Sequence, residues 1–259
     1  MPAELRSRTQ GHTLVLTLSN PDHRNALGPE IYAAGVEAFN VASDNRDIHA
    51  VVIHGEGDVF CAGGNLQRLQ ADRQQPSAVQ AQNIESLHTW IEAVHTFPKP
   101  VIAAVEGAAI NTGFALALAC DLIVAASSAV FVMAYANIAL SPDSGGSWIL
   151  PHALPRQLAS ELLLCGERIG AERLYQLGIV NRICEAGQAL DTALAWAESI
   201  GARAPNVLAS IKELIHDAAG NSLSRHLAQE RDHFVRNLYH ANAGIGIDAF
   251  LAKRKPEYE

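Results

Sequence analysis

The sequence predicts an α/β fold, in which one layered domain is followed by a C-terminal helical region. Short apolar runs, typical of buried strands, alternate with helical patterns, and from about Ala189 onward only helical patterns remain. The chain has 259 residues, 49% of them hydrophobic, which is enough to bury a substantial core. We assign residues 1–188 to the core and residues 189–259 to the helical region.

The first expected elements are a strand, a loop and a helix. Residues 12–19 show the alternation of a strand, Asn20-Pro21 interrupts it, and Pro29 opens a helical pattern that runs to about Ser43. The later elements follow in order: a buried strand at 50–53, a turn-rich stretch at 55–64, a short helix from Asn65, an amphipathic helix through Ile84, Leu87, Ile91 and Val94, a strand at 101–105, an interior helix at 113–120, strands at 122–124 and 129–132, and C-terminal helices broken at Gly201, Pro205, Gly220 and Gly244.

Composition and charge disfavour several classes of protein. The chain has 27 acidic and 19 basic residues, a net charge of -8, which disfavours nucleic acid as a partner. No apolar run reaches membrane-spanning length without a polar break, and Met1-Pro-Ala-Glu lacks the apolar stretch of a signal peptide. We therefore expect a soluble, cytoplasmic protein that has no membrane partner.

The cysteines and histidines do not predict a metal site. Cys61, Cys120, Cys165 and Cys184 are scattered, without a Cys-x-x-Cys pair, and no two histidines have the spacing of a zincin helix. Cys61 lies in a glycine-rich turn, where it could be a nucleophile, but no sequence feature supplies a base for it. We expect reduced thiols and no bound metal.

Asp143 is the one charged residue between Leu122 and Pro155. A carboxylate among apolar residues loses solvation, which suits it to transferring protons. The alternative is structural: Asp143 could cap a helix that begins at Ser144, or lie in a solvated turn, because Pro-Asp-Ser-Gly-Gly is also typical of turns and caps.

Two glycine-rich stretches, residues 60–66 and 106–113, flank buried strands and expose backbone N–H groups near helix N-termini. Either stretch alone is typical of an ordinary turn. Together they could converge two amides on one point, which would form an oxyanion hole.

Ordered motifs along nearly the whole chain resemble those of the enoyl-CoA hydratase/isomerase (crotonase) superfamily. The resemblance implies a spiral of ββα units, a C-terminal helical trimerisation region, and self-association as a homotrimer or a dimer of trimers. It also implies an acyl-CoA thioester as substrate and no separate cofactor, since CoA is part of that substrate. The motifs are Asn20-Pro21, Asn25-Ala-Leu27, Phe60-Cys-Ala-Gly-Gly64, Pro98 to Val105, Gly107, Gly113, Ala119-Cys-Asp121, Ser141-Pro-Asp-Ser-Gly-Gly146, Gly178-Ile-Val180 and Phe250-Leu-Ala-Lys253.

The resemblance also implies catalytic roles. The oxyanion-hole amides would belong to Gly64 and Thr112, where Asn111-Thr112 departs from the family's frequent glycine. The two glutamates of the hydratases fall on Ala115 and Tyr135, and neither can replace a carboxylate. Asp143 instead resembles the acid of the single-acid isomerases, because one base can remove a proton from C2 and return it to C4.

For the substrate and CoA, the resemblance indicates residues from four parts of the chain. A solvated loop charge is the alternative for Arg24, a solvated helix end for Lys253, and a buried space-filling aromatic for Tyr135. The predicted binding residues are His23, Arg24, Ala26, Ala62, Asn65, Leu66, Tyr135, Phe250 and Lys253.

Several other functions stay open or are disfavoured. A hydratase with diverged acid and base residues and a non-catalytic acyl-CoA-binding homologue are the main alternatives to an isomerase. Hydrolase, decarboxylase or ring-opening chemistry would begin at the same oxyanion hole. A dinucleotide fingerprint at Gly55-Glu-Gly57 is disfavoured, because Phe60 replaces its third glycine.

Overall fold

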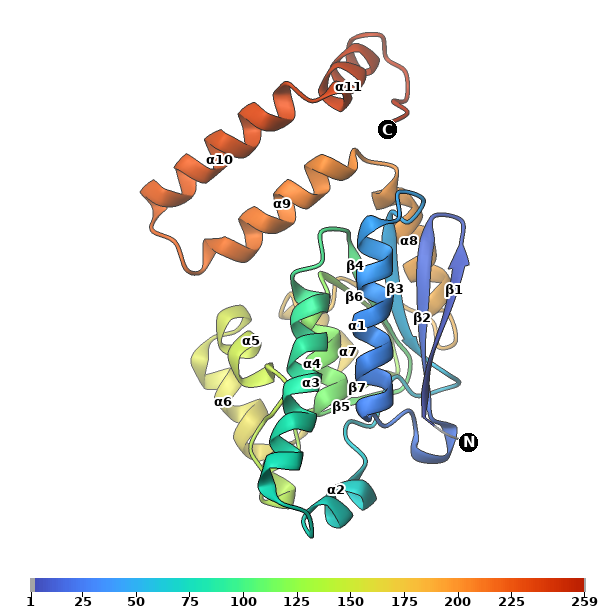
Figure 1. Ribbon diagram of the computed structural model, residues 1–259, viewed down its shortest axis with the longest axis vertical. Coiled ribbons are helices and arrows are strands. Elements are labelled where there is room, and N and C mark those ends of the chain that lie inside the picture. The colour runs from blue at the N-terminus through green and yellow to red at the C-terminus, as the bar shows by residue number, and fades with distance from the viewer. Residues whose placement is uncertain (1–2, 259) are drawn as a thin grey trace.

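The computed structural model describes residues 3–258, which form two sheets surrounded by helices (Figure 1). The larger sheet has the strand order β1-β2-β3-β4-β6-β9, in which the β1–β2 pair is antiparallel and the other pairs are parallel. The smaller has the order β5-β7-β8. The strands are β1 (Glu4–Gln10), β2 (Thr13–Ser19), β3 (Ala50–Gly55), β4 (Val101–Val105), β5 (Ala108–Ile110), β6 (Leu122–Ala126), β7 (Val130–Val132), β8 (Arg168–Gly170) and β9 (Arg182–Cys184).

The helices follow most parallel strands and carry the chain to the next one. The α-helices are α1 (Pro29–Asp44), α2 (Leu66–Asp72), α3 (Ser77–His95), α4 (Thr112–Ala119), α5 (Gly146–Ala153), α6 (Arg156–Cys165), α7 (Ala171–Gln176), α8 (Ala189–Gly201), α9 (Pro205–Ala218), α10 (Leu223–Leu238) and α11 (Ala241–Leu251), and two 3₁₀ turns are η1 (Pro21–His23) and η2 (Tyr135–Ile138).

Alternation along the strands gives the larger sheet two buried faces. In β3, Val51 and Ile53 join the main core beneath α1 and α3, whereas Ala50 and Val52 point to the opposite face. The register preserves this division, since Val52 is paired with Val15 on one side and with Ile102 on the other. Both faces are therefore apolar, as expected for a parallel sheet that helices cover on both sides.

Helix α8 covers the second face, and the later helices form an arm, defined here as α9 to α11. Ala193 and Ala197 of α8 pack on the sheet with residues of β2, β3 and β4. Lys212 of α9 donates hydrogen bonds to the Asp121 carboxylate (2.5 Å) and to the Lys99 carbonyl (2.9 Å), which fastens the start of the arm to the body. Figure 1 shows α10 and α11 beyond α9, at the opposite end of the molecule from α2.

The predicted α/β fold with a helical C-terminal region is confirmed. Some elements were not predicted. The edge strand β1 was missed because its polar residues are almost all exposed. The short strands β5, β8 and β9 and the helices α5 to α7 were not predicted either. The prediction of a break at Gly244 is wrong, since this glycine lies within α11. The division at residue 189 stays a prediction.

No helix in the part of the chain that the structure describes is long and apolar enough to cross a membrane.

Candidate active site

The three predicted catalytic residues, Gly64, Thr112 and Asp143, meet at one small cavity of about 50 Å³. They come from three separate segments: the turn before α2, the first residue of α4, and the loop before α5. The other lining residues come mainly from α1, α2 and α3, and include Leu27, Tyr32, Asn65, Arg68, Leu69, Asp72, Gln80, Asn83, Ile84 and Leu87.

Close backbone packing holds the two glycine-rich stretches side by side. The Cys61 amide donates to the Ala108 carbonyl (3.0 Å), and the Ile110 amide donates to the Cys61 carbonyl (2.9 Å). A Cβ atom at Gly113 would lie 2.6 Å from the Cys61 carbonyl oxygen. Only glycine therefore allows the start of α4 to pack this closely against the backbone of Cys61. The packing brings the predicted amide donors to the same cavity.

Within residues 3–258, the Gly64 and Thr112 amides donate no hydrogen bond. Thr112 is the first residue of α4, so its N–H has no acceptor in the preceding turn. Asn111, the residue before it, has an unusual backbone conformation, with φ 50° and ψ -112°, and this conformation sets the direction of the Thr112 N–H. The Asn111 side chain stabilises that conformation, since Oδ1 accepts a hydrogen bond from the Ala134 amide (2.6 Å). Both amides are therefore free for a ligand oxygen.

The Asp143 carboxylate is held on one oxygen and free on the other. Oδ1 accepts a hydrogen bond from the Tyr135 hydroxyl (2.7 Å), whereas Oδ2 has no hydrogen-bond partner among the described residues. His88 Nε2 lies 2.7 Å from the Asp143 carbonyl oxygen and must be the donor, because a carbonyl only accepts. Helix α5 begins at Gly146, after Gly145, and has no side-chain cap, so the capping alternative for Asp143 is wrong.

Tyr135 is the centre of a small hydrogen-bond network. Besides Asp143, its hydroxyl contacts Ser144 Oγ (2.9 Å) and Thr112 Oγ1 (3.2 Å). The side chain is 5% exposed, and burial, together with the nearby Asp143 charge, raises the Tyr135 pKa well above its usual value. The hydroxyl therefore stays protonated at neutral pH, where it can donate to the carboxylate.

The two positions that carry glutamate in the hydratases hold no acid. Ala115 is completely buried, and a Cβ atom at Gly146 would lie 3.8 Å from the Ala115 Cβ and 2.6 Å from Met133 Cε. A larger side chain at Ala115 would have little room. Tyr135, at the second position, is part of the network described above rather than a simple space-filling aromatic.

The predicted CoA loop lies next to Gly64. The Ala62 amide donates to the Arg24 carbonyl (3.0 Å), and Leu27 forms a parallel bridge with Gly64. The Asn25 side chain donates to the Val59 carbonyl (2.7 Å), which fixes the loop against the turn after β3. His23 and Arg24 are exposed and Ala26 is buried.

Asn65 lines the cavity and also caps α2, since its side-chain oxygen accepts from the Gln67 and Arg68 amides. Leu66, directly after it, is 56% exposed. Phe250 and Lys253 do not join this cavity in one chain: Phe250 lies at the end of α11 and is 83% exposed, and Lys253 follows that helix. Their role toward CoA stays a prediction and would require a neighbouring subunit.

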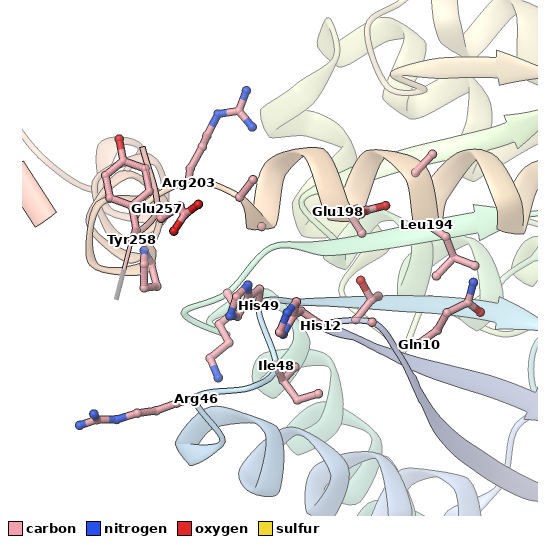
Figure 2. Close-up of a pocket in the computed structure, with 18 of the residues that line it drawn as sticks. Gln10, His12, Arg46, Ile48, His49, Leu194, Glu198, Arg203, Glu257 and Tyr258 are labelled. Carbon is pink, nitrogen blue, oxygen red and sulfur yellow. The ribbon is translucent and has the colours of Figure 1, made fainter. Parts of the chain in front are cut away.

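A second cavity, of about 930 Å³, lies between the β1–β2 turn, the end of α8 and the C-terminal residues (Figure 2). His12 and His49 stack in it with ring centroids 4.3 Å apart. None of the predicted site residues lines this cavity. Despite its larger volume, it is not the candidate active site, because the free amides and the Asp143 carboxylate converge elsewhere.

Several residues at the site were not predicted. Ser144 lies inside the motif around Asp143, but the sequence does not show that it contacts Tyr135. Tyr32, Arg68, Gln80 and Asn83 reach the cavity from α1, α2 and α3, whose side-chain directions the sequence leaves undetermined. The Cys61 thiol is fully buried, which raises its pKa to about 12 and argues against a role as nucleophile.

The chain is similar to known proteins along almost its whole length. A family model described as enoyl-CoA hydratase/isomerase matches residues 8–259. Two relatives from Escherichia coli strain K12, each 32% identical, are a 1,2-epoxyphenylacetyl-CoA isomerase (97% of each chain covered) and a 2,3-dehydroadipyl-CoA hydratase (99% of each). The crystal structure of an enoyl-CoA hydratase from Polaromonas sp. JS666 is 64% identical, with a TM-score of 0.98 over 99% of this chain and 100% of that chain.

Proposed function

The chain belongs to the enoyl-CoA hydratase/isomerase family, and on that basis we propose that it is an enoyl-CoA isomerase. The reaction would shift a double bond from the 3-enoyl to the 2-enoyl position, or rearrange a related ring-opening substrate. The observation that carries this proposal is Asp143, a carboxylate with one free oxygen, at the cavity that the Gly64 and Thr112 amides also reach.

The two amides would bind the thioester carbonyl oxygen. Removing a proton from the neighbouring C2 carbon places negative charge on that oxygen, and one preorganised donor typically lowers the barrier by about 3 kcal/mol. Backbone N–H groups at the start of α4 also gain from the positive end of the helix dipole. The site therefore stabilises an enolate with the chain's own amides.

Asp143 would act as the only base of the reaction. Oδ2 takes the proton from C2, the electron pair of the broken C–H bond delocalises into the enolate and the double bond, and the same oxygen returns the proton to C4. The substrate neither gains nor loses atoms. Tyr135 would hold Oδ1 throughout, which keeps Oδ2 directed at the substrate.

Hydration of a 2-enoyl-CoA is the second candidate function. The names of the Polaromonas protein and of several relatives favour it. Adding water requires one group to activate the water and another to protonate the α-carbon, and Ala115 and Tyr135 occupy the positions of the two glutamates. We therefore rank hydration second.

The same proposal includes a cytoplasmic location and assembly through the arm. Large apolar side chains remain exposed along α10 and α11, including Leu227, Phe234, Leu238, Tyr239 and Phe250, and a second copy of the chain would cover them. Sedimentation of the purified protein should give the mass of a trimer or of a dimer of trimers, and a monomer would contradict this part.

A panel of 3-enoyl- and 2-enoyl-CoA thioesters tests the reaction. The isomerase should convert 3-enoyl-CoA to a conjugated product of unchanged mass, followed by the ultraviolet absorbance of the conjugated thioester. A faster gain in mass by one water molecule from 2-enoyl-CoA would favour hydration and overturn our first choice. No turnover of either class would favour a non-catalytic binding protein.

A further inference from the structure

Polar side chains lie beside apolar ones in the part of the cavity that α1, α2 and α3 form, where Leu69, Ile84 and Leu87 also line the wall. Tyr32 comes from α1, Arg68 from α2, and Gln80 and Asn83 from successive turns of α3. A pocket for a plain hydrocarbon chain would be lined mainly by apolar groups. The polar residues here indicate a different acyl group.

Three of these side chains have unused hydrogen-bonding groups. Gln80 Oε1 is buried and has no partner in the described part of the chain. Within the same residues, the Tyr32 hydroxyl and the Asn83 amide also form no hydrogen bond. A buried polar atom without a partner costs free energy, which a ligand that supplies the missing hydrogen bond would recover.

The charges around the cavity argue against an anionic acyl group. Arg68, the one cation among the described lining residues, already faces Glu30 (3.3 Å) and Asp72 (3.7 Å), and Asp143 adds a further negative charge. A carboxylate on the ligand would have to compete with these acidic side chains for one guanidinium. A neutral group has no such competition.

We infer, on the basis of the proposed function, that the acyl chain carries a hydroxyl group beyond the double bond and that Gln80 and Asn83 bind it. A hydroxyl both donates and accepts, so it fits either orientation of the two side-chain amides. Tyr32 can add a third hydrogen bond from α1.

Helix α2 can provide the additional space that such a chain needs. None of its seven residues is buried, and its N-terminus is held by the Asn65 cap. We expect α2 to move outward about this cap when the acyl chain enters, while Gln80 and Asn83 keep their place on α3, whose second half is anchored by buried side chains from Leu87 to Val94.

The test uses 3-enoyl-CoA thioesters of equal length with a methyl, hydroxyl or carboxylate group at the far end. The wild-type kcat/KM should be about tenfold higher for the hydroxylated than for the plain substrate, the gain expected from one or two net hydrogen bonds. Gln80→Leu and Asn83→Leu should remove this preference and should raise activity on the plain substrate. Gln82→Leu, on the exposed face of α3, is the matched control and should keep the preference for the hydroxylated substrate.

Binding of the saturated hydroxyacyl-CoA and acyl-CoA, measured by calorimetry, separates this inference from the proposed function. A hydroxyl preference in binding without turnover of any 3-enoyl-CoA would overturn the isomerase and support the hydroxyl pocket. Turnover without a hydroxyl preference, or a preference for the carboxylate, would overturn the pocket and leave the isomerase. Retention of the preference in both leucine variants would also overturn it.

Discussion

Helices α4 and α10 lie at opposite extremes of burial. All eight residues of α4 are buried, and its first turn carries Thr112 and Gly113 at the candidate active site. Helix α10 is twice as long, yet His233 is its one buried residue, and Phe234, Leu238 and other apolar side chains face outward. The environment of α4 is complete within one chain, whereas α10 leaves large apolar side chains exposed.

Burial therefore decides which parts of the molecule allow function to be inferred from a single chain. Around α4, the close packing leaves the structure little freedom to adjust to a substitution. The Thr112 amide and the Tyr135 network are therefore held in fixed positions. Along the arm, the same substitutions would meet open space.

Replacing Asp143 by asparagine should have the largest effect. The amide side chain is not a base, yet it has nearly the same shape as the carboxylate and can still accept the Tyr135 hydrogen bond. We expect kcat to fall by about 10³-fold or more, within the range for loss of a catalytic base, while Tm changes little. Steady-state kinetics and thermal unfolding check both. A residual rate within about tenfold of wild type would contradict the role of Asp143.

Gly113→Ala should have the next largest effect, because the new Cβ would lie 2.6 Å from the Cys61 carbonyl oxygen. The start of α4 must then move, and the Thr112 amide with it. We expect kcat to fall by about 10²-fold, as when one oxyanion donor is lost, together with a lower Tm. Gly170→Ala, where a Cβ meets nothing within 4 Å, is the control. It should leave kcat unchanged and should lower Tm less than Gly113→Ala does, since Gly170 only caps α7.

A pair of glycine substitutions compares the body directly with the arm. At Gly35 in α1, a Cβ atom would lie 2.2 Å from Trp90 Nε1, and at Gly244 in α11 it meets nothing within 4 Å. Gly35→Ala should lower the free energy of unfolding by about 1–3 kcal/mol, because overpacking exceeds the gain in helix propensity. Gly244→Ala should raise it by up to about 1 kcal/mol. Urea unfolding measures both, and equal effects would contradict the contrast.

The pH dependence of stability should show a smaller effect of burial. Burial raises the pKa of Tyr32 and Tyr135 above the value of about 10 in the unfolded chain. Folding then favours the protonated phenols, so this contribution is fully present below about pH 10 and is lost as the pH rises further. Tyr135→Phe should show a weaker loss of stability above about pH 10. An identical loss of stability in the wild type and the variant would indicate that the Tyr135 hydroxyl is not shielded from solvent.

The absorbance of tyrosinate gives an independent check. Of the five tyrosines, Tyr32 and Tyr135 should not ionise until the alkaline protein unfolds. The Tyr135→Phe spectrum should therefore match the wild type in the folded range and differ from it only after unfolding.

Much of the fold followed from local sequence patterns, because a strand buried on both faces carries a continuous apolar run. Residues 101–105 were predicted as such a strand and form β4. The polar edge strand β1 was not predicted, because it is held in place by pairing with β2 and not by burial. Gly244 did not end a helix, since neighbouring residues maintain α11 around it.

At the site, the sequence indicated Gly64, Thr112 and Asp143, and the structure brings them to one cavity. It did not indicate that the Tyr135 hydroxyl donates to Asp143, because this contact depends on the positions of η2 and of the loop before α5. The cavity residues that α3 supplies could not be predicted either, since whether Gln80 or Gln82 faces the cavity depends on the rotation of α3.

Transfer of an isotope within the substrate tests the single-base reaction most directly. A 3-enoyl-CoA labelled with deuterium at C2 is incubated in ordinary water, and the product is analysed by mass spectrometry and NMR. On the proposed mechanism, in which Asp143 removes and returns the proton, we predict that part of the deuterium appears at C4 of an isomer with no added water. A product that has gained water, or deuterium that is lost completely even in the first turnover, would contradict the single-base mechanism.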